Sequence, residues 1–155
     1  VSDLAPGELA INTHDGRLFL RKDNDTPSIV DVTGAGATGS IGFLIDGGGV
    51  PISPGLKGTI AVPFGCMITS WTLMTDVAGS VTLDLWRSSF ASYPPTASQS
   101  ITGSAKPMIN SDVKAQSSSL TGWTTILEAG DILAFNVDAV ANLTRLSVGL
   151  AITRL

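Results

Sequence analysis

Apolar and polar residues alternate at every second position in the most regular part of the sequence, residues 143–155. Two alternating sets make up this pattern: Leu146, Val148, Leu150 and Ile152, and between them Ser147, Gly149, Ala151 and Thr153. Successive side chains of a β-strand point to opposite faces, so the pattern predicts a long strand with one buried face. No stretch keeps a helical period beyond two turns, which favours an all-β protein.

Shorter stretches of the same kind fill the region from Phe43 onward, and turn residues separate them. We predict strands at 59–62, 67–75, 81–85, 123–127 and 132–137. Within the second of these, Met67, Trp71 and Leu73 are expected on one face. Short strands at fairly regular spacing are typical of sandwiches and barrels. Residues 43–155 are therefore predicted to form an antiparallel, jelly-roll-like sandwich.

The N-terminal region is predicted to form a small β-hairpin module. Alternation recurs at 8–12, 17–21 and 28–32. Between the first two stretches, Asp15 and Gly16 supply a residue pair that tight hairpin turns favour, and the last stretch can add a third strand. A module of residues 1–32 is too small to bury its own apolar face. We expect it to attach to another surface through Glu8, Leu9, Ile11, Leu18 and Phe19.

A glycine-rich segment follows this module. Residues 33–42 contain four glycines and no charged side chain, a composition typical of a flexible linker. Charge density also changes here, because residues 1–31 hold 9 of the 22 charged side chains. We therefore predict three parts: an attachment module (1–32), a linker (33–42) and a sandwich domain (43–155).

The overall charge is low and acidic, with 14% charged residues and a net charge of -4. This balance argues against a nucleic-acid binder, which needs surplus Lys and Arg, and the chain lacks an apolar run long enough for a membrane span. The uncharged stripe Ser147, Gly149 and Ala151 lies where a solvated strand would carry charge, so we predict a homotrimer interface there. The alternative is that these small residues simply face water.

Candidate catalytic and metal-binding chemistry is sparse. His14 lies at the predicted hairpin turn, and the single Cys66 excludes both an internal disulfide and a cysteine-based zinc cluster. The run Asp23-Asn24-Asp25 lacks the glycine and distal glutamate of a calcium-binding EF-hand. The sequence also lacks a phosphate-binding glycine loop and a nucleophile elbow. We therefore predict no catalytic residues, no metal, no cofactor and no enzymatic activity.

Three aromatic residues are candidates for contact with a receptor. Trp86, Phe90 and Tyr93 end a predicted strand and enter a long loop rich in short polar side chains. Aromatic rings can stack on sugars while neighbouring hydroxyls bind sugar hydroxyls, which describes a glycan site. In the alternative interpretation, Tyr93 and the following prolines stiffen a long crossover, and this interpretation is the favoured one.

The N-terminal residues resemble a known module. The runs LAPGELAINT (4–13), DGRLF (15–19) and RKD (21–23) resemble the GELAINT…DGKLY…KKD module near the N-termini of tail-fibre and other virion proteins of tailed bacteriophages. His14 departs from the small residue usual at its position. The resemblance implies an assembly or attachment element, and because a further strand usually precedes this module, it also implies an upstream segment.

The rest of the chain resembles a β-domain that recurs at the C-terminal ends of phage fibre-like proteins. Six runs carry this resemblance: ITSWTL (68–73), VTLDLW (81–86), YPPT (93–96), GSAKP (103–107), LTGW (120–123) and AGDILAFNV (129–137). The Gly130-Asp131 step before a strand is also similar to trimeric jelly rolls of the tumour necrosis factor kind, in architecture only.

Together these resemblances imply a homotrimeric virion surface protein, at the tail fibre or tail tip or on the capsid exterior. Its expected partners are copies of itself, other virion proteins and a host cell-surface glycan or protein. Two roles remain open. One is a fibre-like or receptor-binding appendage, and the other is a capsid decoration or cement protein that stabilises the phage head.

Overall fold

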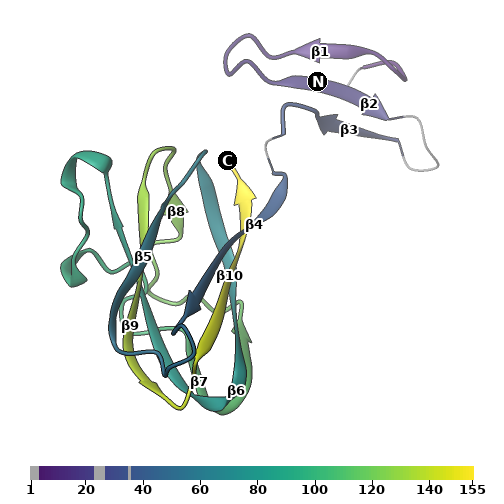
Figure 1. The fold of residues 1–155 in the computed structure, drawn as a ribbon. Helices are drawn as coiled ribbons and strands as arrows, with labels where there is room; N and C mark the ends of the chain where they lie inside the picture. The colour runs from purple at the N-terminus through teal and green to yellow at the C-terminus, as the bar shows by residue number, and fades with distance from the viewer. Residues whose placement is uncertain (1–3, 23–26, 35) are drawn as a thin grey trace. The chain divides into compact units, whose positions relative to one another are not determined.

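The computed structural model describes residues 4–22, 27–34 and 36–155. The chain divides into two compact units, 1–37 and 38–155 (Figure 1). The described residues form strands in both units, and all strand pairs are antiparallel. The predicted all-β class, with a small sheet before a larger one, is therefore confirmed.

The N-terminal unit is a three-stranded sheet. Its strands, in spatial order, are β1 (Leu9–Ile11), β2 (Leu18–Lys22) and β3 (Ser28–Asp31). The turn between β1 and β2 contains Gly16 with φ of 71°, a left-handed conformation that glycine adopts without steric cost. The carboxylate of Asp15 accepts a hydrogen bond from the backbone of Arg17. The predicted hairpin and the third strand are both present.

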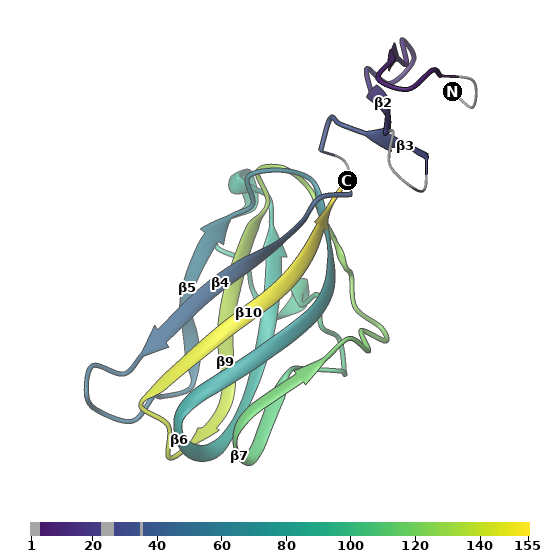
Figure 2. The same ribbon diagram turned by 90° about the vertical axis from the view of Figure 1, so that its right-hand side faces the viewer.

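The C-terminal unit is one large antiparallel sheet with two short 3-10 helices. Its elements are β4 (Thr38–Asp46), β5 (Gly55–Ala61), β6 (Cys66–Ser88), η1 (Phe90–Ser92), η2 (Ala97–Gln99), β7 (Met108–Ser117), β8 (Ile126–Leu127), β9 (Ile132–Ala141) and β10 (Arg145–Arg154). The strand order is β4-β10-β6-β9-β5, and β7 and β8 also pair with β6. The sheet curls strongly (Figure 2).

The curl comes from β6, which is long enough to serve two halves of the sheet. Its first part, 66–75, pairs with β10, and its second part, 80–88, pairs with β9. At the bend between them, a Cβ on Gly79 would lie 2.5 Å from the carbonyl oxygen of Ala141, so only glycine fits. We call the two resulting layers the β10 half (β4, β10, the first part of β6 and the end of β7) and the β9 half (β5, β9, the second part of β6 and the start of β7).

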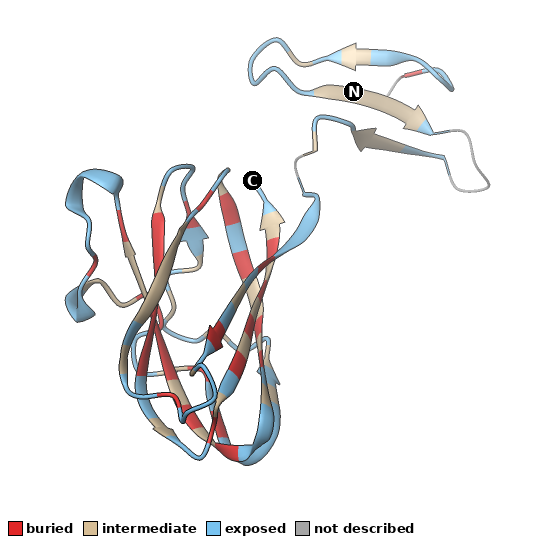
Figure 3. Ribbon diagram, in the orientation of Figure 1, coloured by how far each residue is buried: buried red, intermediate tan, exposed pale blue. Residues whose placement is uncertain are grey.

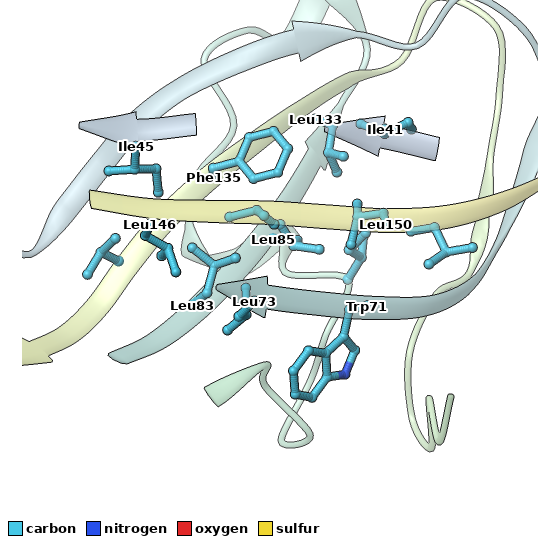
Figure 4. Packing of buried hydrophobic residues seen from close by; sticks show 14 of the residues in the cluster. Ile41, Ile45, Trp71, Leu73, Leu83, Leu85, Leu133, Phe135, Leu146 and Leu150 are labelled. Carbon is cyan, nitrogen blue, oxygen red and sulfur yellow. The ribbon is translucent and has the colours of Figure 1, made fainter. Parts of the chain in front are cut away.

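The core lies between these two halves. Aliphatic residues from both halves meet there, including Ile41, Ile45, Leu73, Leu83, Leu85, Leu133, Leu146 and Leu150 (Figure 4). The rings of Phe43 and Phe135 stack with centroids 4.2 Å apart. Gly58 leaves room for this stack, because a Cβ there would lie 2.7 Å from the Phe43 ring. Burial alternates along β10 as the sequence predicts (Figure 3).

Several predicted boundaries and faces differ in the structure. The strands predicted separately at 67–75 and 81–85 form one continuous strand, β6. Strand β4 begins at Thr38, so the last part of the predicted 33–42 linker is strand; β10 supplies its ladder, and Ile41 within it is buried. Met67 is exposed, although Trp71 and Leu73 are buried, because a register shift opposite Ala151 and Ile152 reverses the side-chain alternation. Of the strand predicted at 123–127, only the two residues of β8 (Ile126–Leu127) form a strand.

Candidate interaction surfaces

The outer face of the β10 half consists of the side chains that point away from the core. Its centre is the stripe predicted from the sequence. Ser147 lies opposite Leu44 of β4 and Met74 of β6, Gly149 lies opposite Gly42 and Thr72, and Ala151 lies opposite Ser40 and Ser70. On β4, β10 and β6 the sheet thus extends the three-residue stripe into a broad face of uncharged side chains.

Apolar side chains project from both sides of this outer face. Leu44 on the edge strand β4 is 56% exposed, and Met74 on β6 is 52% exposed. Charge gathers near one end, where Arg145 and Asp46 form an ion pair with a separation of 3.0 Å. The middle of the face carries hydroxyl and small side chains, and Lys114 of β7 lies opposite Met74 at its side.

Two glycines in the middle of this face are not required by the fold of their own chain. A Cβ on Gly42 would meet no atom within 4 Å, and a Cβ on Gly149 would meet only Thr72 at 3.9 Å, an ordinary contact. Neither glycine has a positive φ. Gly58 and Gly79, in contrast, are held to glycine by close contacts within the domain. Glycine inside a strand weakens it and often marks close approach by another backbone.

A hollow lies beside this flat region, between β6 and β7. It has a volume of about 370 Å³ and is lined by Thr72, Met74, Asp112, Lys114, Ala115 and Gln116. A second hollow of about 450 Å³ continues along the same two strands and is lined mainly by hydroxyls and by the Gln116 amide. The outer face is therefore hollowed where β6 and β7 lie side by side.

The loop from 89 to 107 carries the aromatic candidates, which the structure separates into two environments. Phe90 and Tyr93 belong to one 3-10 turn, in which the Tyr93 N–H donates to the Phe90 carbonyl, and their side chains are 81% and 53% exposed. Trp86 is half-buried on β6 and its Nε1 is shielded from solvent. Two of the three predicted contact residues thus form an exposed aromatic tip.

The base of this loop is fixed by a buried carboxylate. Asp84 on β6 accepts hydrogen bonds of 2.6 Å from both Ser100 and Thr102, and Lys106 lies 3.0 Å from its second oxygen. Lys106 also contacts Asp138 on β9 at 2.5 Å. The sequence gives no sign of this network because its members lie far apart along the chain.

The hydrogen bonds decide the ionisation of the Asp84 network. Burial alone raises the pKa of Asp84, but the hydrogen bonds from Ser100, Thr102 and Lys106 outweigh it and lower the pKa below the ordinary value. The Trp86 indole adds to this lowering, although its N–H falls short of a hydrogen bond. The carboxylates of Asp138 and Asp84 raise the pKa of Lys106. Both partners therefore stay charged at neutral pH.

The N-terminal sheet has two unlike faces. Leu9 pairs with Leu20, and Ile11 pairs with Leu18, so these four aliphatic residues share one face. Leu9 and Ile11 are 60% and 70% exposed. Three of the predicted attachment residues, Leu9, Ile11 and Leu18, therefore lie together.

The other two predicted attachment residues have different positions. Phe19 lies on the opposite face of the N-terminal sheet, together with Arg21 and Asp31. On this side Arg21 donates to the carbonyl of Leu4, whose side chain is buried. The Glu8 carboxylate accepts a hydrogen bond of 2.7 Å from the backbone of Ala5, so it holds a turn.

The described residues contain little material for catalysis or metal binding. Among them, no group of three or more His, Cys, Asp or Glu side chains is placed to hold a metal ion. His14 is exposed, and burial raises the pKa of the Cys66 thiol, which makes it a poor nucleophile. The run 23–25 lies outside the described residues. Within the described ranges, no helix has the length and apolar character to cross a membrane.

Comparisons with protein-family models, with curated proteins and with solved structures found no match for this chain.

Proposed function

We propose that this protein is a non-enzymatic structural protein of a tailed-bacteriophage virion and that it acts as a homotrimeric, receptor-binding appendage. The N-terminal unit attaches it to other virion proteins, and the sandwich projects from the particle. The observation that carries the proposal is the outer face of the β10 half, where the middle of β4 and β10 carries small or uncharged side chains and contains Gly42 and Gly149 that the fold of the chain does not require. Such a face suits contact with further copies of the chain.

The attachment role is supported by the exposed aliphatic face of the N-terminal sheet. A three-stranded sheet of this size buries little apolar surface by itself. Leu9 and Ile11 stay largely exposed in the unit, and burial against a virion partner would remove them from water. The aliphatic face, rather than Phe19 or Glu8, is therefore the part of the module that contacts the particle.

The receptor-binding role is supported by the aromatic tip. Phe90 and Tyr93 project into solvent from a loop whose base is fixed by Asp84 and Lys106. An anchored loop backbone loses little conformational freedom on binding, and three copies on one particle multiply a weak contact through effective concentration. The ligand class that fits is a host surface glycan or the apolar part of a surface protein.

Virions carrying the double change Phe90→Ser and Tyr93→Ser test this role. We expect adsorption to the host to fall at least tenfold, with particle melting unchanged, because both side chains are exposed and hold no core contact. The matched control is Val50→Ser, which removes an aliphatic side chain of 61% exposure from another loop. Normal adsorption combined with a lower particle melting temperature would instead support the capsid decoration role.

A further inference from the structure

The larger hollow along β6 and the end of β7 is lined by polar side chains that carry no charge. Its volume is about 450 Å³, and its seven lining residues include four serines, one threonine and one glutamine. We propose that this hollow binds a neutral glycan. The site is distinct from the aromatic tip of the 89–107 loop. It also does not depend on the proposed homotrimer, although Thr72 lies opposite Gly149 and so borders that contact.

Several polar groups at this hollow are not used by the fold. Thr72 of β6 and Gln116 of β7 are direct cross-strand partners. Ser117 and Ser119 take part in hydrogen bonds within the turn that follows β7. Among the residues that the structure describes, however, the side chains of Ser70, Thr72 and Gln116 form no hydrogen bond. Two hydroxyls and one amide are therefore free to bond to a ligand.

A nearly buried donor adds to this set. Trp71 lines the same hollow and is only 8% exposed. The indole N–H of Trp123 donates to the carbonyl of Ala105 at 2.8 Å, whereas that of Trp71 has no acceptor among the described residues. Figure 4 shows the Trp71 nitrogen on the side of the ring away from Leu73. A buried N–H without a partner costs free energy, and a ligand hydroxyl in the hollow would satisfy it.

The chemistry of the hollow selects a neutral sugar. A sugar hydroxyl both donates and accepts, and it is matched by hydroxyl and amide side chains that do the same. An anion would need a cation, and none of the seven described residues that line this hollow is charged. A hollow of this volume lies within the usual range of small-molecule sites, about 300 to 1,000 Å³.

The neighbouring hollow gives room for a second sugar unit. It shares Thr72 and Gln116 with the first hollow and has a volume of about 370 Å³. Met74, which is 52% exposed, adds an apolar surface for the C–H face of a sugar ring. Asp112 and Lys114 also line it, and their opposite charges leave it without a net charge. A neutral disaccharide is therefore the smallest ligand that fills both hollows.

Solution NMR of the full chain tests the site. The probes are maltose, lactose and cellobiose, which are neutral disaccharides, and N-acetylneuraminic acid, which is an anionic sugar. We expect at least one of the disaccharides, at millimolar concentration, to shift the indole N–H signal of Trp71 and the amide signals of Gln116. The anionic sugar should shift neither. Shifts confined to Phe90 and Tyr93 would place the glycan at the aromatic tip and overturn this site.

A double variant, Thr72→Val with Gln116→Leu, sharpens the test. We expect its affinity for the bound disaccharide to fall about tenfold, since two neutral hydrogen bonds are lost. Valine and leucine keep similar shapes, and valine favours strands. The matched control is Thr59→Val, which changes another half-buried strand threonine, on β5, and should bind as the wild type does. Unchanged affinity in the double variant would overturn the proposal.

Two further results would also contradict a neutral glycan site. One is the absence of any shift at Trp71 and Gln116 with all three disaccharides, and the other is stronger binding of N-acetylneuraminic acid than of any of them. Either result would leave the receptor-binding appendage to its own test, because adsorption of the Phe90→Ser, Tyr93→Ser virions does not involve this hollow.

Discussion

The two halves of the curled sheet present opposite kinds of outer surface. The outer side of the β9 half contains Asp84, whose side chain is buried by residues of the 89–107 loop, and Ala134 and Asn136 beside it are buried as well. The outer side of the β10 half is left open, with Leu44 and Met74 exposed. One layer is covered by its own chain with a charged network, and the other is available to another molecule.

The difference lies in what each surface needs in order to be stable. Asp84 and Lys106 form an ion pair that would be costly to bury without the hydroxyls of Ser100 and Thr102. The outer side of the β9 half is therefore stable only when hydrogen-bonding side chains such as Ser100 and Thr102 are held next to Asp84. The open face has its ion pair, Arg145 with Asp46, at one exposed end, and glycine in its middle leaves room for another backbone to approach.

The largest expected effect comes from removing the buried carboxylate. We expect Asp84→Ala to lower the free energy of unfolding by about 3 kcal/mol, since Lys106 and two hydroxyls then lose a buried partner. Urea denaturation at fixed chain concentration measures this. The control is Asp46→Ala, which removes the exposed partner of Arg145 and should cost less than about 1 kcal/mol. Equal losses in the two variants would remove the distinction between the covered and the open surface.

Part of this arrangement could be predicted from the sequence, and part could not. The alternation in β10 correctly predicted its buried side, because a strand repeats every two residues regardless of its neighbours. The same rule failed at Met67, because the register shift opposite Ala151 belongs to the pairing of two distant strands. The contact between Asp84 and Lys106 could not be predicted from the sequence either, because it joins two segments that are distant along the chain. Phe90 and Tyr93 were placed together because they are close in sequence.

The pH dependence of stability should reveal the same network. The pKa of Asp84 is lower in the folded protein than the unfolded value of about 3.9. Its contribution to the free energy of unfolding is therefore complete above that unfolded pKa and is lost as the pH falls through the folded pKa. The pKa of Lys106 is higher in the folded protein than the unfolded value of about 10.4. Its contribution to the free energy of unfolding is therefore complete below that unfolded pKa and is lost as the pH rises through the folded pKa. The contribution of the pair should therefore be constant between roughly pH 5 and 9.

Urea unfolding of the wild type and of Lys106→Met, at pH values within this range and on both sides of it, measures the effect. The difference in free energy of unfolding between the two proteins should stay level near neutral pH and shrink in strong base, where the wild-type lysine loses its charge. In acid it should also shrink as Asp84 becomes protonated. A difference that changes most around pH 6 to 7 would point to another group and contradict this assignment.

The smallest expected effect on stability is the most informative for the open face. Gly149→Thr adds a side chain where a Cβ meets only Thr72 at 3.9 Å, and cross-strand Thr pairs stabilise sheets. We expect the isolated domain to gain about 0.5 to 1 kcal/mol, while light scattering reports loss of the trimer. The matched Gly58→Thr should instead lower stability, because its Cβ would lie 2.7 Å from the Phe43 ring. If both glycine variants lower the free energy of unfolding by the same amount, the fold of the domain itself requires glycine at 149. Gly149 would then no longer support the open face as an interface between copies.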